Sequence, residues 1–531
     1  MRPERALAVS ALVALTAVAQ MLPAQDSLRA PVRKRSVAED LQLFSQVLNQ
    51  IRINHPDSLD SHALFMAAVE GMVAAADPHS YVIPAARLDS AREVALRDGK
   101  LTSVPISFQF VNGAPLVVGT APGSHAVSVD VLPGDELIGV DGHPVAATSS
   151  DELDLALSGS KGSSVRLSLR RRRADGSIAQ LERSVKRERV EESTAVPAAF
   201  MLDSATGYVR VTTFLGDKVA DDLHSALERL EHDGMHRLVL DLRGNGGGRV
   251  DEAKRIASEF LPKGSIVFTA SGRKPEVTDT GRVQRSFWKS ERRYPIVLLV
   301  DAGTASASEI VAGALQDHDR ALIVGRTTFG KSLLMQTFPL TDGSRMALVI
   351  GKVKTPCGRI IQRDYHATSR HEYYHEAGTA ADTVSRPSCF TDAGRKVFGG
   401  GGIVPDVMLR ETPTPAWLVL ASERGVLFTW AAGIAGKSGG APASASALST
   451  WKPDAATIAD FRSYATSNDI TIPADADTDA LLARALVRAI AYSKLGDAGF
   501  YQVAATNDPE VSAAVSAFAD ANKILRTAGA P

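Results

Sequence analysis

The pattern of apolar positions changes character several times along the 531-residue chain. Between about residues 36 and 96, apolar residues recur every three or four positions, which predicts helices. One such stripe consists of Leu41, Phe44, Val47, Leu48 and Ile51. The turn-forming segment Asp77–Ser80 interrupts this pattern, so we expect an N-terminal helical region with a break near its end.

Apolar and polar residues alternate between about residues 97 and 190, which predicts short strands. The clearest are Ile106–Phe110 and Val165–Leu169. A helix is expected from Ser149 to Leu157, and Asp175–Gly176 predicts a hairpin turn. This part of the chain therefore reads as a small β domain with one late helix.

Strand and helix patterns alternate from about residue 195 to 410, which indicates an α/β sheet domain. The run Ile296–Val300 is continuously apolar and suits a strand that is covered on both faces. After a linker rich in Gly, Ala and Ser at 436–449, helical patterns begin at Asp477 and Asp508. The sequence thus predicts a multidomain α/β protein whose C-terminal region, 411–531, is helical and has no chemistry of its own.

Composition agrees with a globular protein, since 44% of residues are apolar and 22% are charged. The formal net charge of −1 provides no global field for binding nucleic acid. The basic run Arg170–Arg173 is followed by acidic residues, so we interpret it as a solvated hairpin end.

The N-terminus has the pattern of a secretory signal peptide, expected over residues 1–24. Arg2 and Arg5 precede a mostly apolar run at 6–19, which is too short to span a bilayer, and small-residue cleavage sites follow. An uncleaved membrane anchor and an ordinary buried helix are the alternatives. We expect export to a periplasmic or extracellular location, with membrane association possible through an uncleaved segment.

The chain has two cysteines, Cys357 and Cys389. Export permits a disulfide between them, and two unlinked thiols are the alternative.

The densest chemical signal lies at residues 301–310. A strand that ends at Val300 is followed by small residues and then by an apolar helix that begins near Ser308. Ser306 thus lies at a strand-to-helix elbow, where N–H groups at the helix N-terminus can stabilise a developing oxyanion. The alternative is that Ser306 is only a helix cap, and Ser308 competes with it for either role.

A serine nucleophile needs a base, and Lys331 follows Ser306 by 25 residues at the end of the next strand pattern. One helix and one strand would return Lys331 to the same edge of the sheet. A lysine pKa near 10.4 must fall by roughly three units for this role, which requires burial. Phe329, Leu333 and Leu334 supply apolar neighbours; the alternative is a surface lysine near a turn.

These segments resemble the carboxyl-terminal processing, or tail-specific, proteases. The elbow, the spacing and Phe329-Gly330-Lys331 match that family, and Asp241–Gly248 resembles its Asp-Leu-Arg-x-Asn-Pro-Gly-Gly loop. The resemblance spans roughly residues 38–410. It implies that Ser306 is the nucleophile and Lys331 the general base. It also implies an oxyanion hole formed by the N–H of Ala307 and one from Gly247 or Gly248.

The β domain, 97–190, resembles a PDZ domain, which binds peptide C-termini by adding a strand to its sheet edge. It lacks the usual Gly-rich carboxylate loop and has Thr102–Pro105 in that place.

The catalytic segments also depart from the family pattern. The glutamine that orients the lysine is usually four residues after it, where this chain has Met335, and Gln336 lies one step later. We assign Gln336 the orienting role, although one step along a strand changes the face. Gly246 replaces the usual proline, and Ser332 replaces the usual glycine.

Two literal motifs point elsewhere. Gly325–Ser332 fits the phosphate-loop pattern G-x-x-x-x-G-K-[ST], but the residues after it do not read as a helix. His371–His375 fits the zinc pattern H-E-x-x-H, but its flanks carry no apolar helical face. A nucleotide-binding protein is therefore a minor alternative, and a surface loop is preferred to a zinc site.

The expected function is that of a serine endopeptidase that cleaves proteins near their C-terminal tails. We expect no metal, nucleotide or other cofactor, no nucleic acid, and protein or peptide partners with accessible C-termini. A non-catalytic peptide-tail-binding protein on a protease-like scaffold is the alternative from another class. An envelope adaptor and an oligomer both stay open.

Overall fold

The computed structural model describes residues 36–83, 101–366, 373, 386–435 and 441–528, with short gaps. These gaps are 112–113, 121–123, 133, 146, 148–149, 173–176, 189–193, 217, 285–290 and 342–343. The expected signal segment, 1–24, lies outside the described residues. In the described part of the chain, no helix combines the length and apolar character needed to cross a membrane.

The chain divides into two compact units, one that ends at Val73 and one that begins at Ala74. The first contains the two expected helices, α2 (Val37–Asn54) and α3 (Ser61–Ala74). Ser36 caps α2, because its hydroxyl accepts the Glu39 N–H while the Glu39 carboxylate accepts the Ser36 N–H at 2.7 Å. No residue of α2 is buried.

A small β domain occupies residues 101–187 of the second unit. Its elements are β2 (Leu101–Thr102), β3 (Ile106–Val111), β4 (Ala114–Thr120), α5 (His125–Ser128), β5 (Glu136–Val140), β6 (His143–Pro144), α6 (Ser150–Leu157), β7 (Gly159–Ser160), β8 (Ser164–Arg172) and β9 (Ile178–Lys186). The main sheet has the order β3-β4-β5-β8-β9 with antiparallel pairing, and Leu153 and Leu157 of α6 enter its core. The expected strands are confirmed, the hairpin at Asp175–Gly176 lies outside the described residues, and the PDZ assignment stays a prediction.

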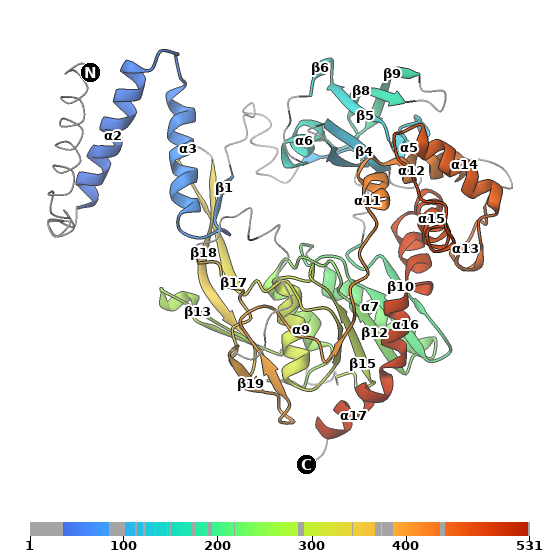
Figure 1. Ribbon diagram of the computed structural model, residues 1–531. Coiled ribbons are helices and arrows are strands. Elements are labelled where there is room, and N and C mark those ends of the chain that lie inside the picture. The colour runs from blue at the N-terminus through green and yellow to red at the C-terminus, as the bar shows by residue number, and fades with distance from the viewer. Residues whose placement is uncertain are drawn as a thin grey trace, which may run out of the picture. The chain divides into compact units, whose positions relative to one another are not determined.

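The larger domain is built on a six-stranded sheet (Figure 1), ordered β10-β11-β12-β15-β16-β21. Its strands and the helices between them are β10 (Ala198–Met201), β11 (Thr206–Arg210), α7 (Val219–His232), β12 (Arg237–Asp241), α8 (Val250–Ser258), β15 (Ile296–Val300), α9 (Ala307–Asp317), β16 (Leu322–Gly325) and β21 (Val407–Met408). All neighbouring pairs except β10–β11 are parallel. Parallel strands bring their carboxyl ends to one edge, where the catalytic loops were expected, and the α/β fold is confirmed.

Alternate side chains of the central strands enter two different cores, as the pleat of a strand requires. In β15, Ile296, Leu298 and Val300 pack with helices α7, α8 and α9. Val297 and Leu299 face the other way, onto helices from the end of the chain. All five residues are buried, which is why this strand reads as a continuous apolar run.

The C-terminal helices are α11 (Ala416–Glu423), α12 (Val426–Ala435), α13 (Ala445–Thr450), α14 (Ala455–Thr466), α15 (Ala476–Thr506), α16 (Pro509–Ser516) and α17 (Phe518–Ala528). Helices α11 to α15 share an apolar cluster that includes Trp430, Phe461 and Leu486. The end of α15 and helices α16 and α17 instead cover the second face of the six-stranded sheet, through residues such as Val511 and Phe518. The last helices are therefore a layer of the larger domain.

A second sheet carries the segment that follows the lysine. Its strands are β1 (Tyr81–Ile83), β13 (Ile266–Gly272), β14 (Asp279–Arg282), β17 (Leu333–Pro339) and β18 (Arg345–Lys354), and the short helix η2 (Pro275–Val277) joins β13 to β14. Strand β18 is central, pairing with β1, β13 and β17. Lys331 precedes β17, so the lysine segment runs from one sheet to the other.

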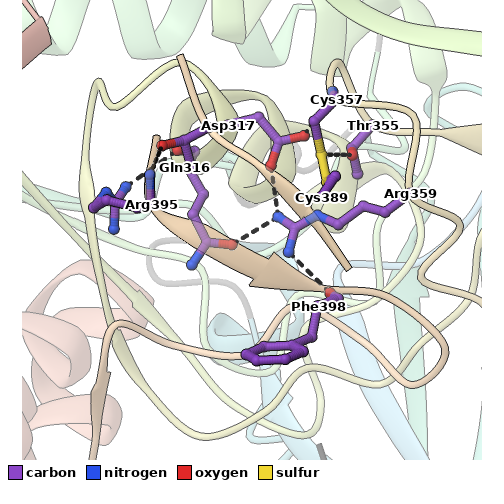
Figure 2. The surroundings of a disulfide bond; sticks show 9 residues. Gln316, Asp317, Thr355, Cys357, Arg359, Cys389, Arg395 and Phe398 are labelled. Carbon is purple, nitrogen blue, oxygen red and sulfur yellow. Dashed lines mark hydrogen bonds and ion pairs between the residues drawn. A yellow bond between two sulfur atoms is a disulfide. The ribbon is translucent and has the colours of Figure 1, made fainter. Parts of the chain in front are cut away.

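A disulfide joins Cys357, just after β18, to Cys389 in the hairpin formed by β19 (Ser388–Phe390) and β20 (Lys396–Phe398). Figure 2 shows its surroundings at the C-terminal end of α9. The Cys357 N–H donates to Asp317 at 3.1 Å, and the buried Arg359 guanidinium pairs with the same carboxylate at 2.7 Å. The disulfide and this ion pair thus anchor the far end of α9, the helix that begins just after Ser306.

We expect the disulfide to stabilise the fold by closing a long loop. Replacing both cysteines by serine should lower the free energy of unfolding in urea by about 3–4 kcal/mol, the chain entropy of a closed loop of this length. The sequence separation is 32 residues. A reductant should destabilise the native chain to a similar extent and leave the double variant unchanged. Equal stability of the native chain and the double variant would contradict a stabilising bond.

Candidate active site

The elbow that carries Ser306 is held by hydrogen bonds to the Gly-rich loop beside it. One carboxylate oxygen of Asp301 accepts the N–H groups of Gly244 at 2.7 Å and Gly303 at 3.0 Å. The Thr304 hydroxyl donates to the Leu242 carbonyl at 2.9 Å. These contacts fix the turn between β15 and α9 against the loop at 242–248, which follows the neighbouring strand β12.

Ser306 is the residue just before α9, but its backbone differs from that of an ordinary helix cap. Its φ of +57° and ψ of −117° lie outside the extended region that cap residues normally adopt. A non-glycine residue in such a conformation stores strain that the surrounding structure must hold, and such strain clusters at functional sites. The competing Ser308 is fully buried, and its hydroxyl has no hydrogen-bond partner among the described residues. The geometry therefore favours Ser306 over Ser308 as a reactive hydroxyl.

Ser306 and Lys331 line the same cavity. The cavity is narrow, at about 20 Å³. Its apolar walls come from several elements: Val250, Val267, Phe268, Ile310, Leu333, Val353 and Ile361. Glu309, Ser332, Lys354 and Thr355 complete the lining. The structure thus brings the two predicted residues to one mostly apolar site, as the sequence spacing suggested.

Glu309 connects the serine elbow to the lysine loop. Its carboxylate accepts the N–H groups of Ser306 and Lys331 through one oxygen, both at 2.8 Å. The other oxygen accepts the Gly330 N–H at 2.8 Å and the Thr328 hydroxyl. One side chain therefore sets the backbone of both Ser306 and Lys331.

Glu309 has no solvent exposure. Burial raises the pKa of its carboxyl to about 7, against the opposing effect of the hydrogen bonds that it accepts. Its charge state therefore changes near neutral pH, in direct contact with the backbone of both candidate residues.

The Gly-rich loop packs tightly against the elbow. A Cβ on Gly247 would lie 2.6 Å from the Ala305 carbonyl oxygen and 2.7 Å from the Ala307 nitrogen, so only glycine fits. The Gly247 N–H donates to the buried Asn245 side chain at 2.9 Å. Neither Gly248 nor Ala307 donates its N–H to another group in the described part of the chain. Of the three oxyanion candidates, Gly248 and Ala307 thus have available donors, whereas that of Gly247 is occupied.

A buried ion cluster stands behind this loop. Asp241 is fully buried, and its carboxylate pairs with Arg210 at 2.6 Å and Arg243 at 2.7 Å. Burial would raise the pKa of Asp241, but Arg243 and Arg210 hold it below its ordinary value. Arg243 also pairs at 2.6 Å with Glu510 of α16, to which Arg326 is bound as well. Helix α16 therefore braces the Gly-rich loop and the segment that leads to Lys331.

Gln336 lies away from the cavity. It is an exposed residue of β17 and is not part of the cavity lining. The β17–β18 pairing shifts register between Leu334 and Met335, but the shift leaves Gln336 exposed. A different glutamine, Gln362, accepts the Ser332 N–H at 2.8 Å.

Sequence reasoning missed three residues of this site: Glu309, Lys354 and Gln362. The sequence contained a signal for Glu309, because Ser306 and Glu309 form the S-x-x-E pattern of a capping box. Lys354 and Gln362 follow in later segments, and nothing in their local sequence relates them to Ser306. Only the packing of β18 and of the segment after it brings these two residues to the lysine loop.

The structure describes the surroundings of the phosphate-loop pattern and part of the H-E-x-x-H pattern. The phosphate-loop pattern at Gly325–Ser332 leads into strand β17, whereas a phosphate loop must open a helix. Of the H-E-x-x-H pattern, the structure describes only Tyr373, a buried residue. In the described part of the chain, no group of three His, Cys, Asp or Glu residues could hold a metal ion.

Several known proteins are similar to this chain in sequence. Residues 205–367 match the model of peptidase family S41. The chain is 29% identical to the carboxy-terminal-processing protease of Bartonella bacilliformis over 62% of this chain and 74% of that protein. It is 33% identical to the chloroplastic carboxyl-terminal-processing peptidase 2 of Arabidopsis thaliana, over 56% of this chain and 58% of the relative.

The chain therefore spans between about half and three quarters of the length of these relatives. Among solved structures, the photosystem II D1 C-terminal processing protease aligns with a TM-score of 0.37 and 25% identity, over 69% of this chain and 86% of that one. The sequence matches confirm the expected resemblance: residues 205–367 are similar to peptidase family S41, and the relatives are named as carboxy-terminal processing proteases.

Proposed function

We propose that this chain is an exported serine endopeptidase that cleaves proteins near their C-terminal tails through Ser306 and Lys331. One observation carries the proposal: a serine at a strained elbow shares a mostly apolar cavity with a lysine, and one buried carboxylate holds the backbone of both. The names of the relatives supply the reaction class.

The first half of the reaction is acyl transfer to the serine. Neutral Lys331 accepts the Ser306 hydroxyl proton while the serine oxygen attacks the peptide carbonyl carbon. The carbon–nitrogen bond then breaks, and the leaving amine takes the proton from the Lys331 ammonium. Water next attacks the acyl ester with Lys331 again as base, which releases the acid and restores Ser306.

The proposed mechanism needs an uncharged Lys331 amine. Phe268, Leu333 and Ile361 give the cavity apolar walls, and Glu309 and Lys354 belong to the same lining. Desolvation by apolar walls disfavours an ammonium ion, whereas a charged carboxylate favours it.

The developing negative charge is assigned to two backbone donors. The N–H groups of Ala307 and Gly248 have no other acceptor among the described residues. Ala307 is also the first residue of α9, so the helix dipole favours an anion there. Preorganised donors of this kind contribute about 3–4 kcal/mol each to the transition state in other serine proteases.

The substrate class follows from the same cavity and from the β domain. A cavity lined by apolar side chains accepts apolar residues, which unfolded tails expose. We propose that the β domain is PDZ-like and presents such tails, and that the chain acts in the periplasm or outside the cell. A non-catalytic tail-binding protein is the competing function, and the following experiment separates the two.

Replacing either member of the pair should abolish proteolysis. Ser306→Ala and Lys331→Ala should each lower the rate of labelled casein digestion by at least about a thousandfold, because they remove the nucleophile and the base. Ser308→Ala removes a hydroxyl that has no hydrogen-bond partner among the described residues, and Lys352→Ala removes an exposed lysine of β18, so both should retain activity. Chelators should have no effect on the native enzyme.

Three results would contradict the proposal. Full activity in Ser306→Ala would exclude this nucleophile. Chelator-sensitive digestion would point to a metal. Tail binding without any digestion by the native chain would favour the competing function.

Glu309 should make stability fall as pH rises through neutrality. Its pKa is about 7 in the folded chain and 4.5 as an unperturbed group, so the folded state binds more protons between these values. The stability from this group is fully present below about pH 4.5 and is lost as pH rises through about 7. Urea unfolding should show the native chain losing about 3 kcal/mol relative to Glu309→Gln across this window.

The same substitution should reduce catalysis. A glutamine offers one oxygen and one NH₂ group, so two of the four donors that converge on Glu309 lose their acceptor. We expect kcat to fall about tenfold or more, since each lost charge-assisted hydrogen bond is worth about 1.5–3 kcal/mol. Glu276→Gln, at an exposed glutamate, is the matched control. Parallel stability curves for Glu309→Gln and the native chain would show that Glu309 does not titrate in this range.

A further inference from the structure

We propose that Tyr373 and Gln362 form a clamp that positions Lys331, in place of a glutamine on β17. This inference rests on the proposed function, because it assigns to both residues the orientation of the general base. Tyr373 lies at the centre of the H-E-x-x-H pattern, so the clamp also gives that segment a role without zinc.

The clamp acts on the two peptide units that flank the Lys331 Cα. In the first unit, the Gly330 carbonyl accepts the Tyr373 hydroxyl at 3.2 Å, and the Lys331 N–H donates to Glu309 at 2.8 Å. In the second unit, the Ser332 N–H donates to the Gln362 side-chain oxygen at 2.8 Å. Fixing both planes fixes φ and ψ of Lys331, and with them the direction in which its side chain leaves the backbone.

The two clamp residues are joined to each other. The Gln362 amide donates to the Tyr373 hydroxyl oxygen at 2.8 Å and to the Arg363 carbonyl at 2.9 Å. The tyrosine hydroxyl is therefore a donor to Gly330 and an acceptor from Gln362. Neither residue can move without breaking a bond that the other needs.

The Tyr373 ring is packed on several sides. Only 2% of the residue is exposed. The Arg363 guanidinium lies 4.3 Å from the ring centre, and the His79 and Phe329 rings meet it edge-on at 4.6 and 5.6 Å between centroids. This packing fixes the position of the ring, so its hydroxyl is held within hydrogen-bond distance of the Gly330 carbonyl.

The protonation state suits the role. Burial raises the pKa of Tyr373 to about 12, so its hydroxyl stays a donor over the whole working range of a protease. Neither clamp side chain therefore titrates in this range. Among the described residues, the titratable groups that face Lys331 are Glu309, which accepts its N–H, and Lys354, which lines the same cavity. Under the proposed function, the pH dependence that loss of the clamp creates belongs to Lys331, whose long side chain can swing toward water once its backbone is loosened.

The experiment compares Tyr373→Phe with Tyr365→Phe. Tyr365 is a neighbour, with its ring 6.5 Å from that of Tyr373, but its hydroxyl makes no hydrogen bond to the described residues. We expect Tyr373→Phe to lower kcat for labelled casein about tenfold at pH 7, with KM within about twofold, because a freer lysine regains its ammonium form. The rising limb of its kcat–pH profile should move up by about one pH unit. Its kcat should therefore approach that of the native enzyme at alkaline pH. Tyr365→Phe should match the native enzyme.

A double-mutant cycle tests the pair. Gln362→Met keeps the shape of the side chain and removes its polar atoms. If the two residues act as a unit, the double variant should lose little more activity than either single variant.

The outcomes separate the clamp from the proposed function. A uniform loss of activity with a lowered Tm and no shift of the limb would make Tyr373 merely structural and overturn the clamp. A Tyr373→Phe enzyme equal to Tyr365→Phe, with Ser306→Ala and Lys331→Ala inactive, would overturn the clamp and leave the dyad intact. No digestion by the native chain, or activity in Ser306→Ala, would remove the proposed function and the clamp together.

Discussion

The candidate site depends on one buried carboxylate. Glu309 has no contact with solvent, yet it accepts hydrogen bonds from the backbone of both Ser306 and Lys331. Burying such a group is costly unless donors converge on it, and here four donors do. The hydrogen bonds from these donors join the elbow to the lysine loop. The relative position of the two candidate catalytic residues is thus set through their main chains.

The sheet supplies the place where these loops can meet. Strands β12, β15 and β16 are parallel neighbours, so the Gly-rich loop, the elbow and the lysine segment all leave the same edge. Helix α9 covers one face and begins just after Ser306, while the disulfide region and the Asp317–Arg359 pair hold its other end. Helices α16 and α17 cover the opposite face, and Glu510 reaches the arginines behind both flanking loops.

The ionisable groups on the two sides of the elbow, Asp241 and Lys331, have different surroundings. Behind the Gly-rich loop, Asp241 is buried with two arginines and stays charged because they offset the loss of water. Within the cavity, Lys331 shares a mostly apolar lining with Glu309 and Lys354. The first environment holds the loop, and the second provides the apolar walls that the proposed mechanism needs. The Gly-rich loop separates these two environments, so both lie within one small region.

The sequence by itself determined the α/β class and the strand-to-helix elbow, and it predicted that Ser306 and Lys331 lie at one sheet edge, because these follow from local periodicity and from the order of elements along that edge. It also held an unread signal for Glu309 in the capping-box spacing. It could not decide the orienting residue: Gln336 had the expected residue type, but the strand directs it to solvent. Gln362, Tyr373 and Glu510 reach the site from distant segments, and such contacts depend on how sheets and helices stack. That stacking minimises the exposed apolar area of the whole chain, so it cannot be predicted from any local sequence pattern. Only the tertiary structure therefore decided which distant residues lie near the site.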